Sequence, residues 1–278
     1  MRIWAQAKDD WAAAISPKKN VLSGSNNNYI SGFCLYGAEG VKISSDNSFV
    51  DGVEVGMNSL GDFEQGGKNE GIDEALYEAD YDLSLPGQVP SIISSMRGVE
   101  IPEGFPPFIT KGPVELDEIT GTTVLEPGTL YIVDEVADFG SFNTIKDIAV
   151  VAKKEVKVGS KNILENIVFA SDDKVLIDTN NTVGGNDFCS NGLFNIYLFS
   201  KDNIEFGSNN ELCGVQMGGR KGLKLGSDVA GVKGVFAEEL DKIDYGSADT
   251  WGTCAQARDS YLALLVIPSA ATSLVLVQ

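Results

Sequence analysis

Short apolar stretches recur along this chain at nearly constant spacing, separated by polar corners. The recurring phrase is an apolar residue, any residue, a second apolar residue, and then usually Gly or Asp, often followed by Ser. Alternation over so few residues predicts short β-strands with one buried face. Copies occupy residues 41–45, 156–160, 175–178, 204–208, 223–227 and 243–247, and the later ones follow one another after 19, 29, 19 and 20 residues.

A second self-similarity lies near the N-terminus, where residues 26–33 align with residues 46–53 at an offset of twenty. Repetition at this period is typical of a solenoid. We therefore predict an all-β, single-stranded, right-handed parallel β-helix with a short helical and loop insertion. Each coil would hold two short strands and bury its apolar residues only against the coils on either side. Asn and Gly at the corners tolerate left-handed backbone, and stacked Asn side chains can form amide ladders.

The pattern also divides the chain into parts. Residues 71–81 and 88–97 predict short amphipathic helices inside an otherwise irregular insertion. The uncharged segment 261–278 is divided by Pro268, which favours two buried strands over a membrane-spanning helix. A helix at the N-terminus and these strands at the C-terminus would cap the open edges of the stack. The expected parts are a capping helix over 1–16, first coils over 17–57, the insertion over 58–121, and the main solenoid with C-terminal strands over 122–278.

Composition narrows the choice of partners. The 278 residues are 43% hydrophobic, which is enough for a sizeable core, and 40 acidic residues against 21 basic ones give a net charge of −19. Such a chain is repelled by nucleic acid and by anionic lipid headgroups, so we predict neither nucleic-acid binding nor membrane insertion. The acidity is interpreted as an aid to solubility. Ca²⁺ on Asp187, Asp202 or Asp228 is the alternative, but no EF-hand or nonapeptide repeat supports it, and we predict no cofactor.

Two residue types decide which chemistry is available. Histidine is absent, which excludes Ser-His-Asp, Cys-His and zinc-His sites. The four cysteines, Cys34, Cys189, Cys213 and Cys254, lack the CxxC spacing of zinc or thioredoxin-type sites. They are consistent either with two disulfides in an oxidising compartment or with four buried thiols.

Several phrases, taken in order, resemble the repeat-rich C-terminal region of TadE/TadG-like proteins of the bacterial tight-adherence (Flp) pilus-assembly system. The matching stretches are 24–55, 71–76, 127–131 and 204–235. Members of that family usually begin with a membrane-anchoring helix, whereas residues 1–16 carry neither such a helix nor a recognisable signal peptide. The chain is therefore interpreted either as a fragment of a longer protein or as a mature form whose targeting segment has been removed. The resemblance implies an envelope protein of a Gram-negative bacterium that supports pilus biogenesis or surface attachment, and it implies no catalytic residue.

An enzyme on the same fold is the main rival. Asp172, Asp173 and Asp178 superficially resemble the acidic motifs of polygalacturonase-like hydrolases, which need one carboxyl group as acid and another as base or nucleophile. The His-Gly and Arg-x-Lys steps of those hydrolases are missing, and Asp is common at corners for backbone reasons. A lyase would use Ca²⁺ with Arg or Lys as the base, and its candidates are Arg97, Arg220, Lys221 and Arg258, none of which has carboxylates at a matching coil position. We therefore predict no catalytic, cofactor-binding or metal-binding residues.

The sequence thus favours a non-enzymatic envelope solenoid that acts in Flp/Tad pilus assembly or surface adhesion. Its partners would be other pilus-assembly or envelope proteins, and its place the periplasm, the outer membrane or the cell exterior. A secreted β-helical polysaccharide lyase or glycoside hydrolase, and an adhesin that binds surface glycans without cleaving them, remain as alternatives.

Overall fold

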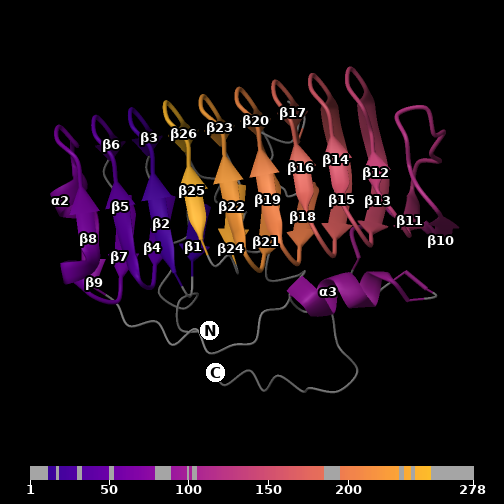
Figure 1. The fold of residues 1–278 in the computed structure, drawn as a ribbon, viewed down its shortest axis with the longest axis horizontal. Coiled ribbons are helices and arrows are strands. Elements are labelled where there is room, and N and C mark those ends of the chain that lie inside the picture. The colour runs from indigo at the N-terminus through magenta and orange to yellow at the C-terminus, as the bar shows by residue number, and fades with distance from the viewer. Residues whose placement is uncertain are drawn as a thin grey trace.

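The chain folds as a β-solenoid of parallel strands, which confirms the predicted fold class (Figure 1). Nine coils are stacked side by side, because one of the two sheets has nine strands and each coil contributes one of them. The computed structural model describes residues 12–16, 19–29, 33–49, 53–78, 89–98, 100–101, 105–184, 195–231, 235–238 and 242–251.

The nine-stranded sheet, called sheet B, contains β12 (Ala137–Asp138), β14 (Val156–Val158), β16 (Val175–Ile177), β19 (Asn203–Phe206), β22 (Gly222–Leu225), β25 (Ile243–Tyr245), β2 (Asn20–Ser23), β5 (Gly40–Ile43) and β8 (Phe63–Gln65), in that spatial order. Sheet A has 17 strands because most coils cross it with a short strand and then a longer one.

The short strands of sheet A are β17 (Thr182–Val183), β20 (Glu211–Leu212), β23 (Ala230–Gly231), β26 (Thr250–Trp251), β3 (Asn28–Tyr29) and β6 (Ser48–Phe49). Its longer strands are β10 (Lys111–Leu116), β11 (Thr129–Val133), β13 (Thr144–Ala152), β15 (Ile163–Ser171), β18 (Ile196–Ser200), β21 (Val215–Gly219), β24 (Val235–Glu238), β1 (Ala12–Ser16), β4 (Phe33–Gly37), β7 (Glu54–Met57) and β9 (Leu76–Glu78). The helices are η1 (Leu60–Asp62), α2 (Ile72–Ala75) and α3 (Val89–Met96).

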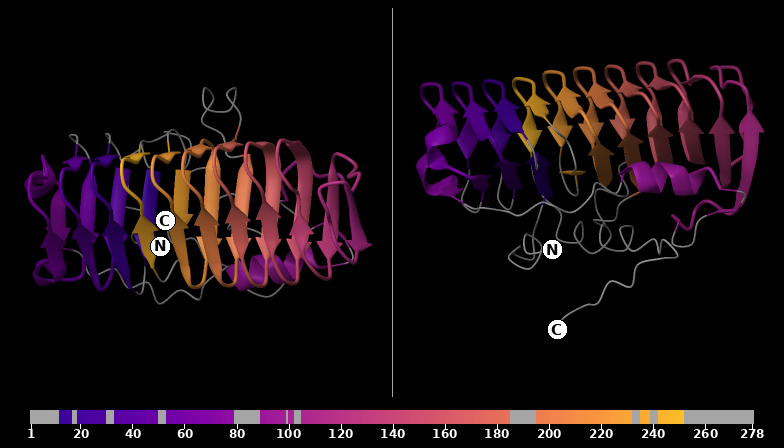
Figure 2. Two further views of the ribbon diagram at one scale, coloured as in Figure 1. Left: turned by 45° about the horizontal axis from the view of Figure 1, so that its top comes forward. Right: turned by 60° about the horizontal axis from the view of Figure 1, so that its bottom comes forward.

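The coils do not stack in the order in which they occur in the chain. Strands β1, β2 and β3, from the N-terminal end, pair with β24, β25 and β26, from the C-terminal end. Residues 12–78 therefore form coils that continue the stack built by residues 111–251, and indigo coils lie directly beside yellow ones (Figures 1 and 2). We call these two sets the N-terminal coils and the central coils, and the three strand pairs between them the seam.

One corner of the coil is the same in all nine repeats. The residue that leads into sheet A from this corner has a left-handed backbone, with φ between 58° and 64°, and the next residue faces the interior. The left-handed residues are Asn26, Asp46, Lys68, Phe142, Lys161, Asn180, Asn209, Asp228 and Ala248. Left-handed backbone favours Asn and Asp among non-glycine residues, which explains why the sequence pattern breaks here.

The interior residue of this corner forms an amide ladder, as predicted. The Asn162 side-chain oxygen accepts from the Asn143 backbone N–H at 2.7 Å, and Asn181 accepts from Asn162 at 2.7 Å. The same bond joins Asn210 to Asn181 and Asn47 to Asn27. Because these buried amides bond both their own corner and the next coil, the ladder satisfies backbone groups that would otherwise be buried without partners.

Sheet A is apolar on both of its faces over the central coils. Val150, Phe169 and Leu198 belong to the interior core of the solenoid. Their sequence neighbours Val151, Val168 and Phe199 point outward and are also buried. Parallel strands that are covered on both faces read as continuous apolar runs, which is how these segments appear in the sequence.

Part of the outer cover comes from α3, which lies along sheet A beside β18 (Figures 1 and 2). Its Ile93 and Met96 are fully buried. Residues 79–110, which we call the crossing segment, connect β9 at one end of the stack to β10 at the other. The helix predicted over 88–97 thus exists as α3.

The N-terminal capping helix predicted over residues 1–16 is wrong for residues 12–16, which form β1 in the middle of the stack; residues 1–11 lie outside the described part. Helix propensity of the alanines yields here to pairing with β4 and β24. The predicted insertion over 58–121 is also wrong in part, because β8 and β9 complete a further coil. The helix predicted over 71–81 is only α2, followed directly by β9.

Candidate functional site

The corner opposite the amide ladder is strongly charged. It joins the end of each long sheet A strand to the next sheet B strand, and it carries two charged residues per coil over five central coils. We call it the charged corner; its residues are Asp134, Glu135, Lys153, Lys154, Asp172, Asp173, Lys201, Asp202, Arg220 and Lys221. Opposite charges alternate for most of its length, so each coil can pair with the next.

These pairs are mostly exposed. Lys153 bonds Asp134 at 2.5 Å, and Lys221 bonds Asp202 at 2.7 Å. The ion pair with Asp202 raises the pKa of the fully exposed Lys221 side chain. Because solvent screens exposed pairs, each one contributes little to stability. Their main effect is to fix the alignment of one coil on the next.

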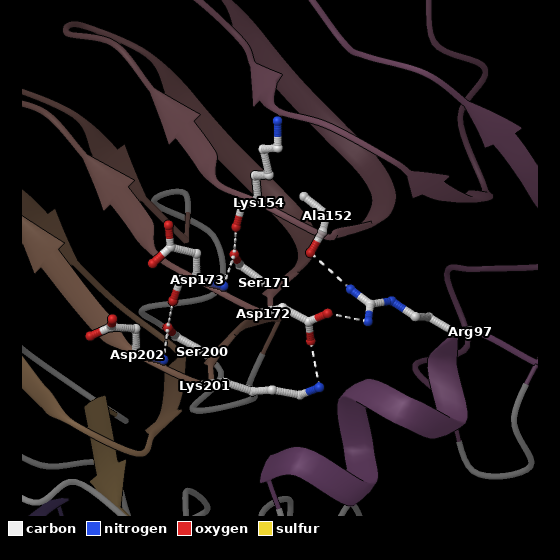
Figure 3. Close-up of polar contacts among 9 residues, drawn as sticks. All are labelled: Arg97, Ala152, Lys154, Ser171, Asp172, Asp173, Ser200, Lys201 and Asp202. Carbon is white, nitrogen blue, oxygen red and sulfur yellow. Dashed lines mark hydrogen bonds and ion pairs between the residues drawn. The ribbon is translucent and has the colours of Figure 1, made fainter.

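A less exposed cluster lies where the crossing segment meets this corner (Figure 3). Arg97, just after α3, forms an ion pair with Asp172 through Nη1 and donates from Nη2 to the Ala152 carbonyl at 3.0 Å. Lys201 Nζ lies 2.6 Å from the other oxygen of Asp172. We call Arg97, Asp172 and Lys201 the Arg97 cluster. It fastens the crossing segment to the side of three coils.

Asp172 is held in its ionised form. Desolvation by partial burial raises its pKa, but hydrogen bonds from Lys201 and Arg97, with the charges of both groups, outweigh that effect and lower the pKa. An ionised carboxylate has no proton to donate at neutral pH, so Asp172 is a poor general acid. Because both of its oxygens are bound by cations, it is also a poor general base.

The neighbouring hydroxyl groups serve the backbone. Ser171 Oγ donates to the Lys154 carbonyl and accepts from the Asp173 backbone N–H at 3.0 Å. Ser200 Oγ donates to the Asp173 carbonyl at 2.6 Å and accepts from the Asp202 N–H at 3.0 Å (Figure 3). Both serines are fully buried and shape the turn, so neither is presented as a nucleophile.

The two acidic motifs of the sequence do not meet. Asp172 lies in the bend before β16 and Asp178 follows β16, so the two acids lie at opposite ends of that strand. Paired carboxyl groups in glycoside hydrolases are about 5–9.5 Å apart. Asp178 lies at the amide-ladder corner, where its carboxylate accepts a hydrogen bond from Ser160 at 2.9 Å.

The remaining candidates are scattered. Asp202 and Lys221 pair with each other at the charged corner, and Asp228 lies at a left-handed position of the opposite corner. Asp187 lies outside the described residues. Among the residues that the structure describes, no group of three His, Cys, Asp or Glu side chains could hold a metal ion.

The seam contains a buried acid that sequence reasoning missed. Asp249 occupies the amide-ladder position of its coil, is fully buried, and accepts from the Val229 N–H at 2.8 Å through Oδ1, while Oδ2 has no hydrogen-bond partner. Desolvation and the nearby Asp228 raise its pKa to about 7, against the opposing hydrogen bond from Val229. Aligning residues 246–249 with residues 207–210 would have revealed an acid in place of Asn210.

One cysteine has a defined chemical state. Cys213, which follows β20, is buried and disulfide-bonded. Cys189 and Cys254 lie outside the described residues, as does the side chain of Cys34. The cysteines were interpreted either as two disulfides or as four buried thiols, and the state of Cys213 agrees with disulfide formation.

Comparison with known proteins gives one partial match. The model of a family described as a domain of unknown function (DUF7867) matches residues 16–105, which cover nearly all of the N-terminal coils and most of the crossing segment. No curated protein and no solved structure matches the chain. Within the described residues, no helix has the length and apolar character needed to cross a membrane.

Proposed function

We propose that this protein is a non-enzymatic β-solenoid of the bacterial cell envelope that supports Flp/Tad pilus assembly or surface attachment. The Arg97 cluster carries the non-enzymatic part of the proposal. Arg97 and Lys201 keep Asp172, an acid of the first acidic motif, in its ionised form. Asp178, the acid of the second motif, lies at the other end of β16. The carboxyl groups are engaged in fixing coils and the crossing segment.

The disulfide at Cys213 supports the proposed location. Disulfides persist in the periplasm and outside the cell, whereas the cytosol keeps most thiols reduced. A stack held by backbone ladders, an amide ladder and a disulfide also resists deformation, because opening any coil breaks bonds to two neighbours. These are properties that an envelope or attachment module requires.

The outer face of sheet B offers a surface for protein partners. Its exposed side chains are charged and pair along the stack: Lys42 with Glu64 at 2.7 Å, Lys157 with Asp138 at 3.5 Å, and Lys174 with Glu205 at 3.5 Å. A partner protein with both acidic and basic side chains could form ion pairs with these residues, in place of the ion pairs that they form with one another in the free solenoid. Such contacts contribute to specificity and to the rate of association.

Attachment of cells tests the role. We expect deletion of the gene in the source bacterium to reduce pilus display and surface attachment several-fold, and the wild-type protein to restore both. The double variant Glu64→Lys/Glu205→Lys, on the outer face of sheet B, should restore pilus display and attachment only in part. Asp134→Lys, at the charged corner, should restore both fully. Normal piliation and attachment after deletion would overturn the proposal.

The enzymatic alternative is tested on purified protein. The wild type and Asp172→Asn would be incubated with acidic polysaccharides, with and without Ca²⁺, and assayed for unsaturated and reducing-end products. We expect no product from either protein. Product formation by the wild type that the Asp172→Asn variant abolishes would show that the acid is catalytic.

A further inference from the structure

The seam is an interface between two parts of the chain joined by a single crossing segment. Its contacts are those of any two consecutive coils: β1 pairs with β24, β2 with β25 and β3 with β26. The Gly24 N–H donates to the Tyr245 carbonyl at 3.0 Å, and the Asn28 N–H to the Asp249 carbonyl at 2.7 Å. The two surfaces that meet here are complementary because each repeats the pattern of the other.

The outer ends of the stack are different. At one end, β10 contains Pro113, and its register with β11 shifts between Lys111 and Val114. At the other end, α2 directly precedes the last strand, β9, and carries the exposed residues Asp73 and Glu74. Proline, irregular register and charge are devices that prevent a strand edge from pairing with another chain. The two edges that form the seam are regular strands, so they are suited to pairing.

At the seam an acid is buried against the N-terminal coils, because the Asp249 backbone N–H donates to the Asn27 side-chain oxygen. Asp249 buries a carboxyl oxygen without a hydrogen-bond partner, which costs free energy. On sheet B, Leu22 lies between Asp244 and Lys42 and interrupts the row of charges at the same junction.

The crossing segment determines whether this junction can open. With α3 against β18, the ten residues between Glu78 and Val89 must span the six strand spacings from β18 to β9. That distance is about 29 Å, and ten residues reach at most about 34 Å. If α3 is released, the 32 residues between Glu78 and Lys111 can reach about 105 Å, roughly twice the length of the stack.

From these observations we infer that the seam is a docking site for a second copy of this chain: the N-terminal coils of one copy pair with β24, β25 and β26 of another. The exchanged contacts are those of the seam itself, so no new surface is needed. The Arg97 cluster keeps the crossing segment short and therefore favours pairing within one chain. This inference concerns self-assembly and does not depend on the pilus role.

Exchange between two labelled populations of the full chain tests the inference. One population carries an affinity tag and the other a fluorophore; they are mixed at equal concentration at pH 8, and co-captured fluorescence is followed over time. Arg97→Ala should exchange at least tenfold faster than the wild type. Lys221→Ala, which removes an ion pair of the charged corner without touching α3, is the matched control and should behave like the wild type.

A second variant acts on the seam itself. Asp249→Asn removes the unpartnered carboxylate oxygen and should slow exchange several-fold relative to the wild type, also in the Arg97→Ala background. Far-ultraviolet circular dichroism verifies that each variant is folded. The inference is overturned if Arg97→Ala exchanges no faster than Lys221→Ala, or if Asp249→Asn exchanges as fast as the wild type.

Discussion

The Asn27 side-chain oxygen accepts a hydrogen bond from the Asp249 backbone N–H at 2.7 Å, although the two residues are 222 positions apart in the chain. The same amide donates to Ser23 Oγ at 3.0 Å and to the Gly246 carbonyl at 3.1 Å. One fully buried side chain thus joins the first coils of the sequence to the last. The amide ladder therefore continues across the seam, in addition to the strand pairing.

Replacing this amide should weaken the whole domain. Asn27→Ala leaves buried donors and acceptors without partners, which we expect to lower the free energy of unfolding by about 2–4 kcal/mol. Asn69→Ala is the control, because Asn69 lies at the end of the ladder, where water replaces the lost bonds; its cost should be below about 1 kcal/mol. Urea unfolding measures both, and equal effects would contradict the special role of the seam.

Asp249 should make stability depend on pH in the neutral range, in a chain without histidine. Its pKa is raised to about 7, so the folded state favours the protonated carboxyl group, while the unfolded chain releases the proton near pH 4. Its contribution to stability is therefore fully present below pH 4, falls as the pH rises, and is lost above pH 7.

The comparison with Asp249→Asn isolates this effect, since other groups titrate alike in both proteins. The variant should gain about 1–2 kcal/mol relative to the wild type between pH 5.5 and pH 8. Urea unfolding at the two pH values gives the difference. A difference that stays constant with pH would show that Asp249 does not titrate in this range.

Close approach of backbones at the seam predicts a second sensitive position. A Cβ atom on Gly24 would lie 2.0 Å from the Gly246 carbonyl oxygen, so the two coils would have to separate. We expect Gly24→Ala to destabilise the protein by about 1–3 kcal/mol. A Cβ atom on Gly67 has no neighbour within 4 Å, so Gly67→Ala should change stability by less than about 0.5 kcal/mol. Matching thermal melts for the two variants would contradict this geometry.

Phe142 is a strained residue on the surface. It has φ of 64° at a corner where five of the other eight coils place Asn or Asp, its side chain is 75% exposed, and Lys161 lies over its ring at 5.2 Å. Phe142→Asn removes an aromatic residue from left-handed backbone at the cost of one exposed cation–π contact, so we expect a net gain of about 0.5 kcal/mol. A loss of stability in chemical denaturation would show that the ring contributes more than the strain costs.

The repeat made the fold predictable, but not the order of the coils. Gly-Ser-Asn corners near residues 24–28 and 207–210 specify that each segment forms a coil, because left-handed backbone and the amide ladder require those residues. Because the coils are so similar, the edge of any coil can pair with the edge of any other. Periodicity alone therefore cannot predict that Gly24 lies beside Gly246 and not, for example, beside Gly226. Only the crossing segment, which has no repeat, selects among these arrangements.

The candidate site was less predictable for a related reason. Asp172 was recognisable as a corner acid, but its partner Arg97 is 75 residues away in an irregular segment, and no spacing rule connects them. The apolar pattern of residues 1–16 predicts a capping helix, whereas tertiary pairing of residues 12–16 with β4 and β24 makes those residues a strand. In each case the missing information was a contact between distant parts of the chain.

The order of the coils also determines when each one can be completed during translation. Residues 12–78 leave the ribosome before residues 235–251 have been synthesised, so β1, β2 and β3 must wait for their neighbours on one side. The seam is therefore the last junction to close in a newly made chain. During this interval the nascent protein presents two regular strand edges, and a chaperone or export factor that binds extended chain would have its clearest target there.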